Sequence, residues 1–209
     1  MAGDASPMQY KKGASVGQPP ILAVTGSPRV HGNCAVLVEE FRRGAERCGV
    51  GVDVVRLHDL CIHPCSACRK CKDSDAADCA IDDDMRQLYP KIRAAPALLI
   101  ASPIYWWNLA AQTKLFIDRC DALDGPSGSA LSKKKVGALI VYGGEDAIAS
   151  GAVNGIRSLQ DAFQYLHMEV VGIVHGSAWE AAAVRLDEKL MGKALELGRD
   201  MAQRVLSSQ

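Results

Sequence analysis

Residues 21–34 of this chain read ILAVTGSPRVHGNC. An apolar run ends in small, polar and turn-forming residues, and a helical pattern begins at once. This is typical of a buried parallel strand that feeds a loop over a helix N-terminus. Unpaired N–H groups and the positive end of the helix dipole converge at such a loop. Ser27 and Asn33 offer hydrogen bonds and Arg29 offers a forked cation, so the stretch predicts a phosphate-binding loop.

Short apolar runs alternate with longer helical patterns along the rest of the chain. Strands are expected at residues 21–26, 52–57, 97–102, 136–142 and 170–175, and helices at residues 33–48, 82–95, 109–121, 149–166 and 180–207. This alternation predicts an α/β fold, with a parallel sheet covered by helices on both faces. Ligands of such folds lie beyond the carboxyl ends of the strands. Pro90 is expected to kink or split the second helix.

Composition limits the classes of partner. The chain has 209 residues with 24 Lys+Arg and 24 Asp+Glu, so no net field draws it to nucleic acid or to an anionic membrane. No apolar run approaches the roughly 20 residues that a membrane-spanning helix needs, and residues 1–20 show no apolar signal segment. We therefore expect a flexible extension at residues 1–19, one domain at residues 20–209, and a cytoplasmic location without nucleic-acid or membrane partners.

The first loop does not match the commoner nucleotide-binding loops. A nucleoside-triphosphate loop needs a Lys before Ser or Thr, and residues 26–34 contain no lysine. A dinucleotide loop needs the spacing G-x-G-x-x-G, which Gly26 and Gly32 do not make. What remains is a compact cradle for a single phosphate, of the kind that the flavodoxin-like fold uses for FMN.

Four motifs together resemble a known family. They are GSPRVHGNCAVL at 26–37, PCSACRKC at 64–71 with Cys79 and DDM at 83–85, ASPIYWWN at 101–108, and KLFIDR at 114–119. Over about residues 20–200 the chain resembles the NADPH-dependent FMN reductase-like superfamily, and within it the iron–sulfur flavoprotein branch. The resemblance implies a flavodoxin-like fold, with a five-stranded parallel sheet in the order 2-1-3-4-5 and a cysteine-rich loop at residues 58–81.

The resemblance also implies bound FMN, which would carry the chemistry without a catalytic side chain of the protein. Cys34 stands where relatives often have Ser or Thr, so its backbone N–H is expected to do most of the binding there. A plainer alternative makes residues 105–107 an apolar cap on the core. Separately, His175, just after a strand, is the one histidine that is a candidate to lie near the ligand. By motif position the expected FMN-binding residues are Ser27, Arg29, Asn33, Cys34, Pro103, Ile104, Tyr105, Trp106, Asn108, Gly143 and Gly144.

The cysteine-rich loop is expected to bind metal through four thiols, Cys65, Cys68, Cys71 and Cys79. Two-residue spacings are typical of a [4Fe–4S] cluster. Zinc and metal-free thiols stay open as alternatives, because the last interval is seven residues where relatives often have about five. Cys61 is interpreted as a spare thiol. Since the loop follows the second strand, it is expected to open on the same end of the sheet as the FMN loop and to exchange electrons with the flavin.

Two charged motifs have structural interpretations. The acidic run 82–84 is interpreted as capping the helix that follows, with acid–base chemistry as the alternative. Lys114, Asp118 and Arg119 have helical spacing and are interpreted as an i,i+4 pair or a subunit contact.

The expected function is an FMN-dependent oxidoreductase or electron-transfer flavoprotein. It would pass electrons from a carrier such as ferredoxin, or from NAD(P)H, to a small acceptor such as a quinone, an oxygen species or free flavin. A cluster-free NAD(P)H-dependent FMN or quinone reductase and a thiol-based redox sensor are the alternatives. The resemblance implies a homodimer or homotetramer.

Overall fold

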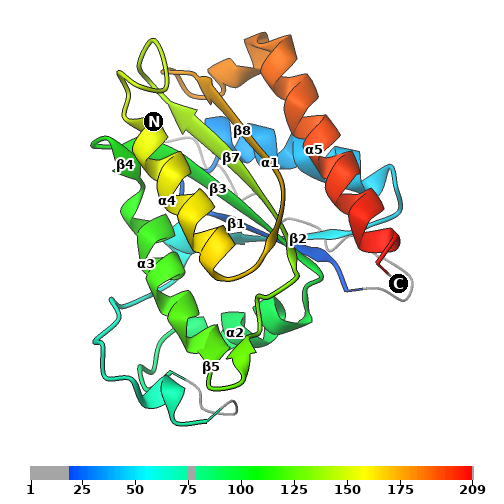
Figure 1. Ribbon diagram of the computed structural model, residues 1–209. Coiled ribbons are helices and arrows are strands. Elements are labelled where there is room, and N and C mark those ends of the chain that lie inside the picture. Colours follow the sequence, from blue (N-terminus) through cyan, green and yellow to red (C-terminus); the bar gives the residue numbers. More distant parts are fainter. Residues whose placement is uncertain (1–18, 75–78, 209) are drawn as a thin grey trace, which may run out of the picture.

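The computed structural model describes residues 19–74 and 79–208. The predicted N-terminal extension, residues 1–19, lies outside this part of the chain except for Pro19. The main sheet has five parallel strands: β1 (Ile21–Thr25), β2 (Val52–Arg56), β3 (Ala97–Tyr105), β7 (Lys135–Tyr142) and β8 (Glu169–Ser177). They lie side by side in the order β2-β1-β3-β7-β8 (Figure 1). In chain order this is 2-1-3-4-5, which confirms the flavodoxin-like fold.

Helices cover both faces of the sheet (Figure 1). Alternate residues of β1 point to opposite faces: Ile21 and Ala23 join the core beneath α1 (Asn33–Glu46) and α5 (Glu188–Leu206). Leu22 and Val24 join the core beneath three other helices. These are α2 (Met85–Ala94), α3 (Ala111–Arg119) and α4 (Ala152–Tyr165).

α1 and α5 pack closely because each helix has a glycine that faces the backbone of the other helix. A Cβ atom at Gly44 would lie 3.0 Å from the carbonyl carbon of Leu195 and overlap its oxygen. A Cβ atom at Gly198 would lie 3.0 Å from the Ala45 nitrogen and overlap the Phe41 oxygen. Larger side chains at these two positions would force the helices apart.

Several boundaries differ from the predicted ones. β3 runs three residues further than expected and forms a hairpin with β4 (Asn108–Leu109). The second helix starts at Met85 and continues through Pro90, so the predicted split is wrong. Pro90 has no N–H, so one backbone carbonyl of the preceding turn lacks its helix partner. Because Pro90 is exposed, water can bond to that carbonyl instead. α5 starts at Glu188 and not near 180, because the Asp187 carboxylate accepts a hydrogen bond of 2.9 Å from the Leu190 N–H and so caps the helix there.

The connections hold short elements. They are the 3-10 turns η1 (Leu57–Asp59), η2 (Lys70–Lys72), η3 (Cys120–Leu123) and η4 (Ala183–Leu186), and the small hairpin of β5 (Asp124–Gly125) and β6 (Gly128–Ser129). Within residues 19–74 and 79–208, no helix combines the length and apolarity that a membrane crossing requires.

Candidate functional site

A cavity of about 190 Å³ lies beyond the carboxyl ends of β1, β3 and β7. Four segments that are far apart in sequence meet there: they follow β1 and β8 and lie at the ends of β3 and β7. Its lining residues are Ser27, Arg29, Asn33, Cys34, Pro103, Ile104, Tyr105, Val141, Tyr142, Gly143, Ala178 and Trp179. The structure therefore gathers most of the residues predicted for FMN around one cavity.

The loop before α1 leaves helix donors available to a ligand. Gly32 occupies the N-cap position, so no side chain caps the first turn, and that turn contains no acidic residue. The N–H groups of Asn33, Cys34 and Ala35 have no partner earlier in the helix. Ser27 lies 5% exposed, and its Oγ accepts a hydrogen bond of 3.3 Å from the Arg29 N–H. These features make an anion-binding helix N-terminus.

The side chain of Asn33 has a different task from the predicted one. Its Nδ2 donates hydrogen bonds to the carbonyls of Ala178, at 3.1 Å, and Glu180, at 2.9 Å. Its Oδ1 accepts a hydrogen bond of 3.2 Å from the Val184 N–H. Both amide hydrogens are thus used to tie α1 to the segment after β8. Asn33 is left with its backbone N–H for an anion.

Cys34 lines the cavity but is only 2% exposed. Burial raises the pKa of its thiol to about 12, so the thiol stays neutral at pH 7. A neutral thiol is a weak donor, which leaves the backbone N–H as the stronger group at this position.

Buried hydroxyl groups support the loop from below. Thr113 Oγ1 donates to Ser102 Oγ at 2.9 Å, and Ser102 Oγ donates to the Pro103 carbonyl at 2.9 Å. Both side chains are 0% exposed. Gly26 rests on them: a Cβ atom there would overlap Thr113 Oγ1 and lie 3.1 Å from the Thr113 nitrogen. This support was not predicted from the sequence, although Ser102, which follows the apolar run of β3, was a signal for it.

The aromatic motif forms the turn of the β3–β4 hairpin. Trp106 and Trp107 have φ values of 47° and 59°, as the two central residues of a type I′ turn require. Trp107 Nε1 donates to the Ala149 carbonyl at 3.0 Å, so the hairpin is docked on the loop after β7. Trp106 is 89% exposed, so the core-cap alternative is wrong for it. Trp106 and Asn108 line a neighbouring hollow between the hairpin, α3 and α4.

Trp179 lines one side of the cavity, and it was not predicted from the sequence. Its ring lies against Gly143, where a Cβ atom would be 2.8 Å from Trp179 Cζ3. Trp179 is 75% exposed, so its outer face is open to solvent. Gly144 packs against Ser150 instead, at 3.0 Å from a Cβ atom to the Ser150 Cβ. His175 approaches the cavity through Tyr142, whose hydroxyl is 3.3 Å from His175 Nδ1.

The four predicted metal ligands surround one hollow of about 280 Å³. Cys65 and Cys68 are exposed, while Cys71 and Cys79 are partly buried. Among the residues that the structure describes, no three His, Cys, Asp or Glu side chains are close enough together to hold one metal ion. The four cysteines therefore line one hollow, and no three of them are gathered tightly enough for a single metal ion.

The position of this hollow corrects the sequence prediction. Its walls include Asp118 and Asp121, at the C-terminal end of α3, whereas the hairpin and the phosphate loop lie beyond the other end of that helix (Figure 1). Nine helical residues span about 13 Å. The prediction that both loops open on the same end of the sheet is wrong. Lys72 holds the cysteine loop at the far end, since its Nζ donates to the carbonyls of Asp121, at 2.7 Å, and Asp124, at 2.5 Å.

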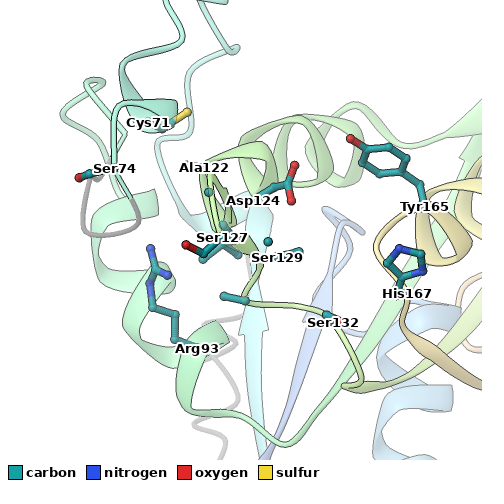
Figure 2. Close-up of a pocket in the computed structure, with 14 residues that line it drawn as sticks. Cys71, Ser74, Arg93, Ala122, Asp124, Ser127, Ser129, Ser132, Tyr165 and His167 are labelled. Carbon is teal, nitrogen blue, oxygen red and sulfur yellow. The ribbon is translucent and has the colours of Figure 1, made fainter.

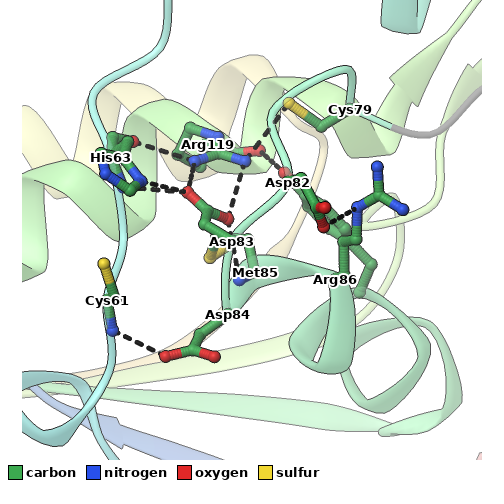
Figure 3. Close-up of polar contacts among 10 residues, drawn as sticks. Cys61, His63, Cys79, Asp82, Asp83, Asp84, Met85, Arg86 and Arg119 are labelled. Atoms are coloured by element: carbon green, nitrogen blue, oxygen red, sulfur yellow. Dashed lines mark hydrogen bonds and ion pairs between the residues drawn. The ribbon is translucent and has the colours of Figure 1, made fainter.

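A buried ion pair stands beside Cys79 (Figure 3). The side chains of Arg119 and Asp83 are both 0% exposed and are joined by two hydrogen bonds. Arg119 also donates to the His63 carbonyl at 2.9 Å and to Cys79 Sγ at 3.3 Å. The interpretation of Arg119 as part of an i,i+4 pair or a subunit contact is wrong, because its side chain is buried and pairs with Asp83. The Lys114–Asp118 pair, at 2.5 Å, is confirmed.

The acidic run before α2 fastens the cysteine loop as well as the helix. Asp84 is the N-cap residue of α2, but its side chain makes no capping hydrogen bond. Asp83, one residue earlier, accepts hydrogen bonds from the Met85 N–H at 3.0 Å and from the His63 N–H at 2.9 Å. Asp84 accepts one from the Cys61 N–H at 2.7 Å. Burial by itself raises the pKa of Asp83, but the hydrogen bonds from Arg119 and the two N–H groups outweigh it and lower the pKa. The carboxylate is thus ionised at neutral pH and fitted to hold structure.

A larger hollow, of about 690 Å³, lies near β5, β6 and the end of α4 (Figure 2). Its polar wall contains Arg93, Asp124, Tyr165 and His167, and Cys71 is the predicted site residue that reaches it. Among the described residues that line it, none lies in the first turn of an α-helix. The smaller cavity therefore has the chemistry expected of a phosphate site, although it is not the larger of the two.

Comparisons with known proteins agree with these features. The sequence profile of the NADPH-dependent FMN reductase family matches residues 19–182. An iron–sulfur flavoprotein of Methanosarcina thermophila is 36% identical over 152 residues, covering 73% of this chain and 76% of the relative. One from Methanocaldococcus jannaschii is 30% identical, covering 73% and 75%. A flavodoxin from the domain Archaea has a similar fold, with a TM-score of 0.56 at 14% identity over 89% of this chain and 98% of the other.

Proposed function

The chain belongs to the NADPH-dependent FMN reductase family, and we propose that it is an FMN-dependent oxidoreductase. Electrons would pass from NAD(P)H or a reduced carrier such as ferredoxin to a small acceptor. The observation that carries this proposal is the N-terminus of α1, where a glycine N-cap leaves the first-turn N–H groups available inside the cavity. A phosphate fits such a site better than any neutral ligand.

The residues that line the cavity fit the two parts of FMN, its phosphate and its ring system. Ser27 and the first-turn N–H groups of α1 would hold the phosphate, and Arg29 is exposed at the rim, where its guanidinium can add charge. Tyr105, Gly143 and Trp179 would border the ring system and exclude water from its sides. Bound FMN supplies the redox chemistry, accepting a hydride or single electrons. The protein's part is to bind and orient it.

We propose that the four cysteines hold a [4Fe–4S] cluster. Zinc draws its four thiolates into close mutual contact, whereas a cluster fills a space between them. The thiols here surround a hollow of about 280 Å³, which favours the cluster. The two relatives named as iron–sulfur flavoproteins support the same choice. Because the hollow lies beyond the far end of α3, we do not place the cluster in contact with the flavin of the same chain.

The flavin proposal is tested with ligands on the unmodified protein. It should purify yellow without oxygen, and the flavin-free protein should bind FMN at least 100-fold more tightly than riboflavin, because riboflavin lacks the phosphate. Isothermal titration measures both affinities. A protein that takes up no FMN would refute the proposal. Equal affinities would show that the α1 N-terminus does not bind the phosphate.

Two alternatives for the cysteines are distinguished by metal analysis. Stoichiometric iron and acid-labile sulfide after anaerobic purification would support the cluster, and their absence with NAD(P)H turnover would support a cluster-free reductase. The exposure of Cys65 and Cys68 favours a third candidate, a thiol-based redox sensor. Reversible oxidation of these thiols without turnover would support it. We also propose a homodimer or homotetramer, which light scattering would test.

A further inference from the structure

Cys79 differs from the other three cysteines in the contacts that fix its position. Cys65, Cys68 and Cys71 follow one another at two-residue spacing, and the turn between them is locally fixed: the Ala67 N–H lies 3.4 Å from Cys65 Sγ, and Ala67 and Arg69 have φ values of 53° and 59°. Residues 72–78 separate Cys79 from this turn. The position of Cys79 relative to the others therefore depends on tertiary contacts.

Arg119 provides such a contact. Its Nη2 donates to Cys79 Sγ at 3.3 Å from the C-terminal end of α3, forty residues away in sequence. The guanidinium is planar, and Asp83 and the His63 carbonyl fix its orientation (Figure 3). A guanidinium held in this way directs one N–H of Nη2 at Cys79, and the flexible ammonium group of Lys has no such fixed geometry.

The same group joins both ends of the cysteine loop. Arg119 binds the His63 carbonyl at the entry of the loop, and Asp83 and Cys79 at its exit. Asp84 adds a second link from exit to entry: its carboxylate accepts the Cys61 N–H at 2.7 Å, and its N–H donates to the Cys61 carbonyl at 3.1 Å. The loop is thus closed around a buried cation next to one of its four thiols.

We propose that Arg119 is a positioning residue for the fourth cluster ligand, and that its hydrogen bond to Cys79 Sγ raises the reduction potential of the cluster. This inference rests on the proposed cluster. An N–H donor withdraws electron density from a ligating sulfur and stabilises the more negative, reduced cluster. The buried side chain of Arg119 keeps that donor in a dry environment, where a hydrogen bond is stronger than in water.

The test compares Arg119→Lys with the matched control Asp83→Asn. Lysine keeps the positive charge but cannot reach Asp83, the His63 carbonyl and Cys79 together. Asparagine removes the negative charge and keeps the Arg119–Cys79 bond. Each protein is reconstituted without oxygen. Iron per chain, the midpoint potential from an EPR-monitored redox titration, and the thermal unfolding temperature are then measured.

We expect Arg119→Lys to make the cluster harder to reduce, by about tenfold in the reduction equilibrium constant, which is ~59 mV toward more negative potential. Asp83→Asn should leave the midpoint unchanged or move it the opposite way, although it also lowers stability. If Arg119→Lys does not fold, the double variant Arg119→Gln, Asp83→Asn replaces it, because this neutral pair buries no unpaired charge. Its midpoint should also move to more negative potential than that of the wild-type protein.

The outcomes separate the two proposals. A wild-type protein without iron would overturn the proposed cluster and this inference with it. A wild-type protein with a cluster, and a variant with an unchanged midpoint, would overturn the inference alone. Equal shifts in Arg119→Lys and Asp83→Asn would do the same, because they would show that only general loop stability matters.

Discussion

Gly26→Ala should damage the phosphate loop from beneath. The new Cβ atom would overlap Thr113 Oγ1 and lie 3.1 Å from the Thr113 nitrogen, so a rotation of the threonine side chain cannot relieve all of the contact. Thr113 is 0% exposed and cannot move outward. Overpacking of this kind costs about 1–3 kcal/mol, and loss of the Thr113–Ser102 hydrogen bond adds about 1 kcal/mol.

The expected change is therefore a loss of about 2–4 kcal/mol in the free energy of unfolding. For a domain of this size, this lowers the thermal unfolding temperature by roughly 5–15 °C. Because the strained residue begins the phosphate loop, the affinity for FMN should also fall at least tenfold. Chemical denaturation followed by circular dichroism gives the first quantity, and isothermal titration gives the second.

Two variants make the reasoning refutable. Thr113→Ala removes the overlapping hydroxyl, so the double variant Gly26→Ala, Thr113→Ala should recover about 1–3 kcal/mol relative to additivity. The matched control is Gly192→Ala in α5, where a Cβ atom meets nothing within 4 Å and stability should rise by about 0.5–1 kcal/mol. A free energy of unfolding that is unchanged in Gly26→Ala, or that the double variant does not recover, would show that the Gly26–Thr113 contact is not tight.

Three further predictions follow from the same structure. The pKa of Asp83 is lower in the folded than in the unfolded protein, so its carboxylate adds to the free energy of unfolding above the unfolded pKa of about 3.9. This contribution is lost as the pH falls through the folded pKa, so the free energy of unfolding should fall less steeply with acid in Asp83→Asn than in the wild-type protein. At pH 8, iodoacetamide should label the exposed Cys61, which is not a proposed cluster ligand, but neither Cys34 nor Cys120, since burial raises the pKa of both thiols to about 12. Mass spectrometry of the native protein checks this, and labelled Cys34 would contradict it. FMN should quench the fluorescence of Trp179, so Trp179→Phe should lose part of the quenching measured in the wild-type protein, and equal quenching in both would place the ring away from the flavin.

Elements made of consecutive residues were predictable. The five strands and the loop from Gly26 to Asn33 were predicted from local patterns, and the sheet order that the family resemblance implied is confirmed. An anion site at a helix start is built from neighbouring N–H groups, so a short stretch of sequence contains all of it. Whether FMN occupies that site stays a prediction.

Contacts between distant residues were not predictable in this way. Arg119 was interpreted as part of an i,i+4 pair or a subunit contact, and it lies buried against Cys79. The Asn33 amide reaches Glu180 at a separation of 147 residues. The cysteine loop follows β2, yet Lys72 fixes it near the C-terminal end of α3.

The local pattern of the chain thus specifies the phosphate loop, the order of the elements and the spacing of the first three cysteines, because each depends on backbone geometry over a few residues. The placement of the cysteine loop, the partner of Arg119 and the aromatic wall at Trp179 arise only when the chain is folded. Each depends on which distant groups can be buried together with their hydrogen bonds satisfied, and this is a property of the packed molecule as a whole.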